Sequence, residues 1–217
     1  PGTYWVFITD ANGCIDSSGT VISEAPNVLT IASVITNDVL CFGDNTGSAS
    51  ITSVLHGIAP YYFEWRDASN NLLSTTPTAT DLVIGNYTCS VTDSSNCTVQ
   101  HTVTINQPNP LLSNITSTNV SCFGFSDGMI NTNASGGIAP YTYSWHDING
   151  FNATTNNVSN LDPGTYWVFI TDSNGCIDSS GSVITEPTPL SYTVSTIDPK
   201  CHNDNDGSIV LVVSGGI

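Results

Sequence analysis

Short segments in which apolar and polar residues alternate recur along the chain, separated by clusters of Gly, Pro and Asn. In the segment 141–146, Tyr141, Tyr143 and Trp145 share one face of a strand, because successive side chains of a strand point to opposite faces. No apolar run has helical spacing. The pattern predicts an all-β sandwich with strands at residues 111–120, 128–134, 141–146, a weaker pair within 152–161, 165–171 and 177–185.

The strand at residues 165–171 contains two alternating sets of side chains, and a diverged copy at residues 87–92 shows which set is inside. Only the set Tyr166, Val168 and Ile170 stays compact and apolar in that copy. The segment Leu161-Asp-Pro-Gly-Thr-Tyr166 resembles a tyrosine corner, in which a Tyr hydroxyl donates to the backbone of the preceding turn, and Tyr4 should have the same role. The expected core therefore includes Trp65, Trp145, Tyr87 and Tyr166.

The chain is a tandem repeat. The segment that begins Pro1-Gly-Thr-Tyr-Trp-Val-Phe-Ile-Thr-Asp10 returns at residues 163–172, and the spacings from Tyr4 to Tyr87 to Tyr166 are 83 and 79 residues. This period suits small immunoglobulin-like β-sandwich domains of about 80 residues arranged head to tail. The predicted divisions are 1–26, the last two strands of a preceding repeat; 27–107 and 108–187, two complete repeats; and 188–217, the first two strands of a following repeat.

Two expectations follow from this division. The joints contain Pro, as in Glu24-Ala-Pro-Asn27 and Gln107-Pro-Asn-Pro110, and this favours short, stiff connections. The partial repeats should not fold alone, and a longer array or a neighbouring chain should complete them.

Composition narrows the class of protein. The chain has 217 residues with 2 basic and 18 acidic side chains, a poor match to nucleic acid, because phosphate binding needs clustered Lys and Arg. No segment approaches the ~20 apolar residues of a membrane-spanning helix, so we expect none in this window. Few charges, abundant Ser, Thr and Asn, and paired cysteines are typical of an exported surface protein.

Three motifs at fixed offsets resemble a known family. They are Cys-Phe-Gly-x-x-x-Gly at Cys122, Gly-Ile-Ala-Pro-Tyr at Gly57 and Gly137, and Pro-Gly-x-Tyr-x-Val-x-Ile-Thr-Asp-x-Asn-Gly-Cys at Pro163. Together they resemble the SprB repeat of the giant surface adhesins of gliding Bacteroidetes, over both complete and both partial repeats. The resemblance implies a long, filamentous, extracellular adhesin on the bacterial cell surface, exported by type IX secretion and moved by the gliding machinery. Its implied partners are adjacent repeats of the same chain, that machinery and surface polysaccharide.

Seven cysteines fall into three classes. Cys89 occupies a core valine position and should be a free, buried apolar residue, while the others form two recurring sets: head cysteines Cys41, Cys122 and Cys201, and tail cysteines Cys14, Cys97 and Cys176. In an immunoglobulin-like sandwich the head and tail cysteines lie at opposite ends. A strand of about 7 residues spans roughly 23 Å, whereas bonded cysteines need Cα atoms within about 7 Å.

The pairing of these cysteines has three alternatives. A bond between adjacent repeats would join Cys41 to Cys176 and leave Cys97 and Cys122 for repeats outside this window. If the first strand is short or the topology differs, bonds within a repeat would join Cys41 to Cys97 and Cys122 to Cys176. The third alternative is free thiols.

Two further sites are hypotheses. The segment Asn203-Asp-Asn-Asp-Gly207 offers oxygens from Asp204 and Asp206 to calcium, although Asp, Asn and Gly are also what a solvated turn prefers. Trp167 and Phe169 fall on the outward face of their strand, where they could stack on a sugar or pack against a neighbouring segment.

The sequence contains none of the common catalytic motifs, and the four His occupy unrelated repeat positions, so we expect no enzyme. The alternative to an adhesin is an array of carbohydrate-binding modules attached to a secreted enzyme or polysaccharide-binding protein.

Overall fold

The structure, a computed structural model, describes residues 1–23 and 28–217. These residues form two compact units, one of residues 1–38 and 45–106 and the other of Val39–Asp44 and Gln107–Ile217. The short segment Val39–Asp44 thus belongs to the first repeat in sequence and to the second unit in space. The predicted joint at residues 24–27, with the boundary between residues 26 and 27, lies outside the described residues.

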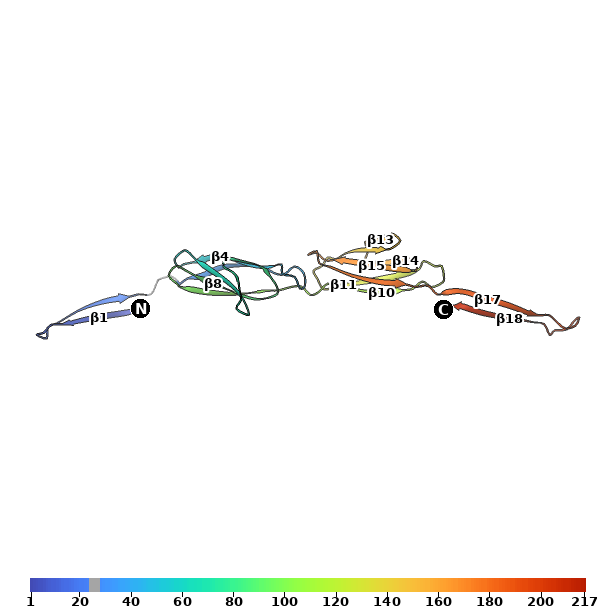
Figure 1. Cartoon of the computed structure of the whole chain (residues 1–217), viewed down its shortest axis with the longest axis horizontal. Helices are drawn as coiled ribbons and strands as arrows, with labels where there is room; N and C mark the ends of the chain where they lie inside the picture. The colour runs from blue at the N-terminus through green and yellow to red at the C-terminus, as the bar shows by residue number, and fades with distance from the viewer. Residues whose placement is uncertain (24–27) are drawn as a thin grey trace. The chain divides into compact units, whose positions relative to one another are not determined.

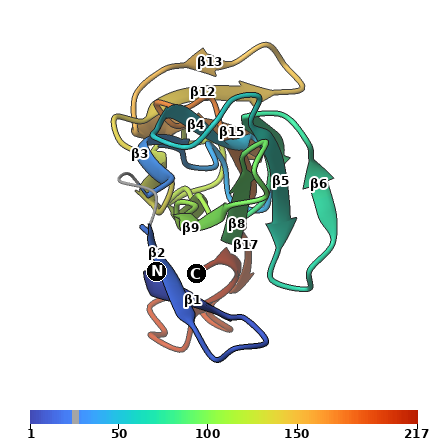
Figure 2. The same ribbon diagram turned by 90° about the vertical axis from the view of Figure 1, so that its left-hand side faces the viewer.

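The first unit consists of a β-hairpin and a sandwich of seven strands (Figure 1). The hairpin pairs β1 (Gly2–Thr9) with β2 (Ile15–Ile22). One sheet of the sandwich has the strand order β3 (Thr30–Asn37), β4 (Gly47–Leu55), β7 (Thr78–Leu82). The other has the order β6 (Leu72–Ser74), β5 (Tyr62–Asp67), β8 (Gly85–Thr92), β9 (Thr98–Ile105), and Figure 2 shows β5 and β6 side by side.

The second unit repeats this arrangement. One sheet has the order β10 (Leu112–Thr118), β11 (Gly128–Ser135), β14 (Asn157–Leu161). The other has the order β13 (Asn152–Ala153), β12 (Thr142–Asp147), β15 (Gly164–Thr171), β16 (Ile177–Ile184). A second hairpin pairs β17 (Thr188–Ile197) with β18 (Ser208–Gly216). Both sandwiches are immunoglobulin-like, with three strands facing four, and every pair of strands is antiparallel.

Each sandwich has its own core between its two sheets. Trp145 lies at the centre of the second core, fully buried, and its indole N–H donates to the Thr155 carbonyl at 2.9 Å. Trp65 has the same place in the first core and donates to the Pro77 carbonyl at 3.2 Å. Around Trp145 pack Val120, Ile130, Val158, Leu161, Tyr166, Val168, Ile170 and Ile184. The predicted core face of residues 165–171 is therefore the one that the structure buries.

The tyrosine corner is present in both sandwiches. The hydroxyl of Tyr166 donates to the Asp162 carbonyl at 3.0 Å, and that of Tyr87 donates to the Val83 carbonyl at 3.0 Å. Both rings are buried, and the Tyr166 ring meets Phe151 edge to face. The bond fixes the turn that leads into β8 or β15, as expected for an immunoglobulin-like sandwich. The residue equivalent to Asp162 would precede Pro1, so the same role for Tyr4 stays a prediction.

The prediction of an all-β fold is confirmed. The predicted strands match β10, β11, β12, β15 and β16 to within two residues at each end, and the weaker pair corresponds to β13 and β14. Among the described residues there is no helix of a length and apolar character that could cross a membrane.

Candidate functional site

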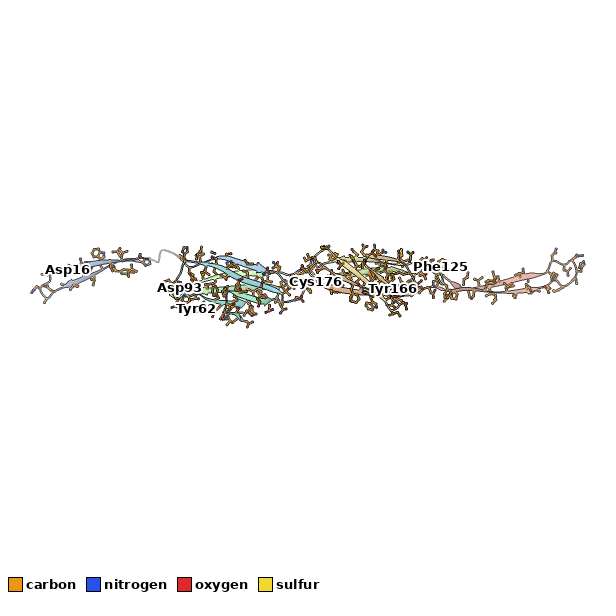
Figure 3. All side chains as sticks on the ribbon, turned by 90° about the horizontal axis from the view of Figure 1, so that it is seen from above. Asp16, Tyr62, Asp93, Phe125, Tyr166 and Cys176 are labelled. Atoms are coloured by element: carbon orange, nitrogen blue, oxygen red, sulfur yellow. A yellow bond between two sulfur atoms is a disulfide. The ribbon has the colours of Figure 1, made fainter. Side chains whose placement is uncertain are left out.

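A disulfide links the two repeats in sequence. Cys41 and Cys176 are bonded, with their Cα atoms 5.6 Å apart and a sequence separation of 135 residues, and both lie in the second unit. Figure 3 labels Cys176. The structure thus has the bond between adjacent repeats. The alternative pairs within a repeat, Cys41 with Cys97 and Cys122 with Cys176, are wrong, and Cys97 and Cys122 are free and exposed. The physical reason is the separation of head and tail cysteines at opposite ends of one sandwich.

The cysteine on the second repeat lies in a tight turn, which we call the tail turn (residues 171–177). Asp172 organises this turn: its Oδ1 accepts from the backbone N–H of Asn174 and of Cys176, each at 2.9 Å. Its Oδ2 accepts from the backbone N–H of Ile138 at 2.8 Å, so the same carboxylate also holds the Gly-Ile-Ala-Pro segment. One buried Asp therefore joins two motifs that are 34 residues apart in the chain.

The same tail turn occurs in the other two copies, at residues 92–98 and 9–15. Asp93 Oδ1 accepts from Ser95 and Cys97, and its Oδ2 accepts from Ile58 at 3.0 Å. In the hairpin, Asp10 Oδ1 accepts from Asn12 at 2.9 Å and from Cys14 at 2.8 Å. The residue before the cysteine has a positive φ in every copy: 85° at Gly13, 63° at Asn96 and 86° at Gly175. Asn tolerates this region better than most residues, which explains why the first repeat can depart from Gly here.

The environment of both buried carboxylates favours the ionised form. At Asp172 burial is the largest single influence and raises the pKa, but the backbone hydrogen bonds, led by that of Ile138, together outweigh it. The pKa of Asp172 therefore lies below the ordinary value of 3.8. At Asp93 the hydrogen bond from Ile58 is the largest influence and also lowers the pKa below 3.8. The tail turn is thus built around a charged carboxylate.

The cysteine of the first repeat lies in a second recurring loop, which we call the head loop: Val39–Asp44 and its equivalents 120–125 and 199–204. In the first copy the N–H of Gly43 donates to Gln107 Oε1 at 3.0 Å. In the second, the N–H of Gly124 donates to Glu186 Oε2 at 2.9 Å. The acid or amide that precedes the Pro-rich joint therefore holds the head loop in place.

The bonded head loop and tail turn also meet through polar and apolar contacts. The Asn174 side-chain amide donates to the Leu40 carbonyl at 2.9 Å. A groove beside the disulfide is lined by Cys41, Phe42 and Asp44 from the head loop, Pro110 and Leu111 at the start of the second repeat, and Gly175, Cys176 and Ile177 from the tail turn. The disulfide is therefore one part of a larger docking arrangement.

Asp93, Asp172, Gln107 and Glu186 are functional residues that the sequence reasoning missed. The signal was present, since Asp10, Asp93 and Asp172 occupy the same place in every tail motif, and Glu24, Gln107 and Glu186 all precede a Pro-containing joint.

One of the two proposed calcium ligands, Asp206, has a hydrogen-bonding role in its loop. Asp206 Oδ1 accepts from the backbone N–H of Lys200 at 3.1 Å, as Asp127 Oδ1 accepts from Ser121 at 2.9 Å in the preceding copy. Across residues 1–23 and 28–217, no three His, Cys, Asp or Glu side chains lie close enough together to hold a metal ion. Calcium binding at Asp204 and Asp206 stays a prediction, which thermal unfolding with and without a chelator measures.

The candidate glycan face lies on the outer side of the four-stranded sheet of the second sandwich. Trp167 and Phe169 are 49% and 44% exposed, and His146 meets Phe169 edge to face with ring centroids 6.0 Å apart. Trp167 also has a structural role: it pairs across the sheet with Gly181, and a Cβ on that glycine would come within 2.9 Å of the indole ring. The same arrangement of Trp5 over Gly19 occurs in the first hairpin.

Cys89 lies outside these loops, in the core of the first sandwich. Cys89 is free, fully buried and packed in the first core, and burial raises the pKa of its thiol to about 11. A thiol in that state is a poor nucleophile and behaves as a small apolar side chain.

Solved structures similar to the chain include fragments of several Ig domains. An amphioxus IgVJ-C2 molecule is 14% identical, with 70% of this chain and 96% of that chain covered and a TM-score of 0.31. Extracellular domains 3–5 of Drosophila OTK are 15% identical, with 84% and 69% covered and a TM-score of 0.30. The N-terminal four Ig domains of Dscam1 isoform 1.9 are 15% identical, with 72% and 42% covered and a TM-score of 0.30, so this chain spans less than half of that fragment. The assignment of an immunoglobulin-like fold rests on the two facing sheets themselves.

No curated protein matches the chain. The family model of the SprB repeat matches it three times, at residues 33–70, 114–150 and 193–217. Each match contains one head loop, and the first two extend through the Gly-Ile-Ala-Pro segment and the core tryptophan. The predicted resemblance is confirmed, since the SprB repeat model matches the chain at these three places.

Proposed function

We propose that the chain is a structural repeat segment of a long filamentous adhesin on the bacterial cell surface, and that its repeats give the adhesin length and stiffness during gliding. The three SprB repeat matches support a cell-surface adhesin. We infer no enzymatic role for this segment. The proposed stiffness under tension rests on the Cys41–Cys176 bond, which ties the head loop of one repeat to the tail turn of the next.

This bond determines which part of the chain bears tension. When the chain is pulled from its two ends, force reaches Cys41, crosses the disulfide and continues from Cys176. Residues 42–175 are then outside the load path, and they contain both core tryptophans and most strands of both sandwiches. Only a covalent bond does this, because the contacts between packed side chains are individually weak and yield to a sustained pull.

Force spectroscopy of the chain tethered at both ends tests this role. With the bond intact, the fully extended chain should be shorter than after reduction by the length of 135 residues, about 450 to 490 Å at roughly 3.3–3.6 Å per residue. The matched control, Cys41→Ser with Cys176→Ser, should reach the full length with or without reductant. An equal extension of the native chain in both conditions would show that the bond carries no load.

The location and the gliding role need a test on cells. An antibody raised against the described sandwiches should label intact, unpermeabilised cells of the source bacterium, and the label should move along gliding cells. Label that appears only after permeabilisation would contradict the surface location, and a stationary label on gliding cells would contradict the motility role. Loss of surface label in cells that lack type IX secretion would support export by that route.

The second candidate function is carbohydrate binding at the exposed Trp167 and Phe169, since half-exposed rings on a flat sheet can stack on sugars. The chain offers its own control, because the equivalent residues of the first repeat are Thr88 and Ser90. On a glycan array, binding by the second repeat that Trp167→Phe preserves and Trp167→Ala abolishes without unfolding would favour this function. Absence of binding to any glycan would leave the structural role alone.

A further inference from the structure

One row of paired positions crosses the outer face of the four-stranded sheet of the second sandwich. Asn152 of β13 pairs with His146 of β12, which in turn pairs with Trp167 of β15. Trp167 pairs with Gly181 of β16. Side chains of directly paired residues lie on the same face of a sheet, with Cβ atoms about 4.5–5.5 Å apart. The row therefore places an amide, an imidazole and an indole next to one another.

The indole of Trp167 lies flat on the sheet. A Cβ built on Gly181 would be 2.9, 3.0 and 3.0 Å from the atoms Cε3, Cδ2 and Cζ3 of Trp167. Nearly equal distances to three atoms of one ring mean that the plane of the ring faces the glycine. Gly181 thus covers one face of the indole, and the side chain is still 49% exposed. The other face is a flat apolar platform, of the kind on which a sugar ring stacks.

Beside this platform, three polar side chains form a chain of hydrogen bonds with a defined direction. Asn152 Nδ2 donates to the Gly150 carbonyl at 2.9 Å, so Asn152 Oδ1 faces His146 Nδ1 at 3.0 Å and accepts from it. Because Nδ1 bears the hydrogen, Nε2 of the neutral imidazole accepts from the Ser144 hydroxyl at 2.8 Å. The Ser144 oxygen keeps its lone pairs and Asn152 Nδ2 keeps one N–H, so an acceptor and a donor are available to a ligand.

This face of the sheet has no acidic or basic side chain. None of the outward positions of β12, β13, β15 and β16, all of which the structure describes, is an Asp, Glu, Lys or Arg. A sugar with a carboxylate or sulfate group would find no cation to pair with here, and the net charge of -16 on the chain would repel it. The face therefore favours an uncharged sugar.

The first sandwich has a different surface at the same positions. Thr88 replaces the indole and pairs with Thr102 rather than with a glycine. Glu64 and Arg66 replace the serine and the histidine and form an ion pair, with Oε2 and Nη2 3.0 Å apart. The flat indole, the polar row and the absence of charge thus occur together in the second sandwich and not in the first.

We propose that the outer face of the second sandwich binds a neutral, glucose-type pyranose, which stacks on Trp167 while its hydroxyls bond to Ser144 and Asn152. A pyranose with equatorial hydroxyls fits because its axial C–H groups form a flat apolar face and its hydroxyls lie at the rim, level with the polar row. His146 is a positioning residue that orients both polar side chains through its two ring nitrogens. The inference rests on the carbohydrate-binding candidate function and adds to it the polar contacts and the class of sugar.

Isothermal titration calorimetry of the full chain with cellohexaose, a neutral glucose oligomer, tests this site. Trp167→Ala should lower the affinity by roughly tenfold or more, whereas Trp167→Phe keeps an aromatic ring and should keep most of it. Ser144→Ala and Asn152→Ala should each weaken binding by about fivefold, the effect of one net hydrogen bond. A glucuronic acid oligomer of the same length and linkage should not bind the native chain. The midpoint of thermal unfolding, measured for each variant, shows that the fold is kept.

A gain of binding tests the charge argument separately. Ser179 faces outward and pairs with Phe169, so Ser179→Lys places a cation beside the platform. This variant should bind the glucuronic acid oligomer. The first sandwich offers the matched control Gln100→Lys, since Gln100 pairs with Ser90 in the equivalent place. It adds the same charge without a platform and should not bind that oligomer.

The outcomes separate this site from carbohydrate binding in general. If the native chain bound both oligomers equally, or if Ser144→Ala and Asn152→Ala bound cellohexaose as tightly as the native chain, the proposed site would be overturned while carbohydrate binding stood. If no glycan bound at all, both the site and the candidate function would be overturned.

Discussion

At the scale of single residues, the two sandwiches serve as controls for each other, because each core position is filled twice. Most equivalent core residues are both apolar, but two positions differ. Cys89 stands where the second core has Val168, and Thr132 stands where the first has Ile51, and all four side chains are buried. These differences make two predictions possible.

The Cys89 thiol should not react with alkylating reagents in the folded chain. Burial raises the pKa of its thiol to about 11, so at pH 8 only about one thiol in a thousand is ionised, and the side chain has no access to solvent. Alkylation with iodoacetamide at pH 8, followed by mass spectrometry, should modify Cys14, Cys97, Cys122 and Cys201 and leave Cys89 unmodified. The swap Cys89→Val should change the free energy of unfolding by less than about 1.5 kcal/mol. Rapid labelling of Cys89 would contradict its burial.

Thr132 should be a weak point of the second core. Its Oγ1 is buried and has no hydrogen-bond partner among the described residues, although its backbone N–H donates to Asn157 Oδ1. A buried hydroxyl without a partner costs about 1–3 kcal/mol. Thr132→Val keeps the shape and removes the hydroxyl, so denaturant unfolding should show a gain of about 1 kcal/mol. The control Thr142→Val, at an exposed site, should show little change, and a loss of stability in Thr132→Val would mean that the hydroxyl is satisfied.

At the scale of elements, the tail turn is the unit that repeats most faithfully. One carboxylate closes the turn and, in the two sandwiches, also holds the Gly-Ile-Ala-Pro segment, so the strands β5 and β8, and likewise β12 and β15, are tied together at one end. Figure 3 labels Asp93 in the first sandwich and Cys176 in the second. The turn combines a structural role with the presentation of a cysteine.

The charge at Asp93 and Asp172 predicts a loss of stability in acid. The pKa of each carboxyl is lower in the folded chain than the ordinary 3.8, so the unfolded chain binds protons more readily. The stabilising contribution should therefore be complete above about pH 4 and should decline as the pH falls through the lowered folded pKa values. Denaturant unfolding measured from pH 6 to pH 2 checks this.

The matched variant for that experiment is Asp93→Asn with Asp172→Asn. It should be less stable at neutral pH, because an amide nitrogen replaces one acceptor oxygen, and its stability should depend less on pH below 4. Asp10→Asn, in the hairpin outside both sandwiches, should leave the acid transition of the sandwiches unchanged. An equal pH dependence in native chain and double variant would assign the acid transition to other carboxyls.

At the scale of the whole molecule, the disulfide closes a loop of 135 residues. In the chain-entropy treatment, a loop of that length stabilises the folded chain by about 5 kcal/mol, because it restricts the unfolded chain. Reduction, or Cys41→Ser with Cys176→Ser, should lower the midpoint of thermal unfolding, and Cys97→Ser should not. An unchanged midpoint after reduction would mean that the unfolded chain is restricted in some other way.

Much of the fold could be predicted because each sequence pattern involves residues close together in the chain and occurs in more than one repeat. The alternation in residues 165–171 is ambiguous by itself, since both of its sets are apolar, and the diverged copy with Thr88 and Ser90 on the outer face resolves it. The tyrosine corner was predictable for the same reason, because the Tyr and its acceptor turn are four residues apart.

The roles of Asp172 and Glu186 could not be read in this way. Asp172 binds the Ile138 N–H across 34 residues, and Glu186 binds the Gly124 N–H across 62 residues. A recurring Asp in a turn motif predicts only the local turn, because turns favour Asp whatever its second oxygen contacts. The distant partner follows from the pairing of strands.

The sequence alone determined the repeat, its period, the face of each main strand that is buried and the two recurring sets of cysteines, because these depend on local alternation and on comparison between copies. Only the tertiary structure decided which head cysteine bonds which tail cysteine, since a disulfide needs two Cα atoms within a few ångströms and the sequence left three arrangements open. It also decided that Val39–Asp44 belongs to the same compact unit as Cys176. Both outcomes depend on the path of the chain through space, which no local pattern contains.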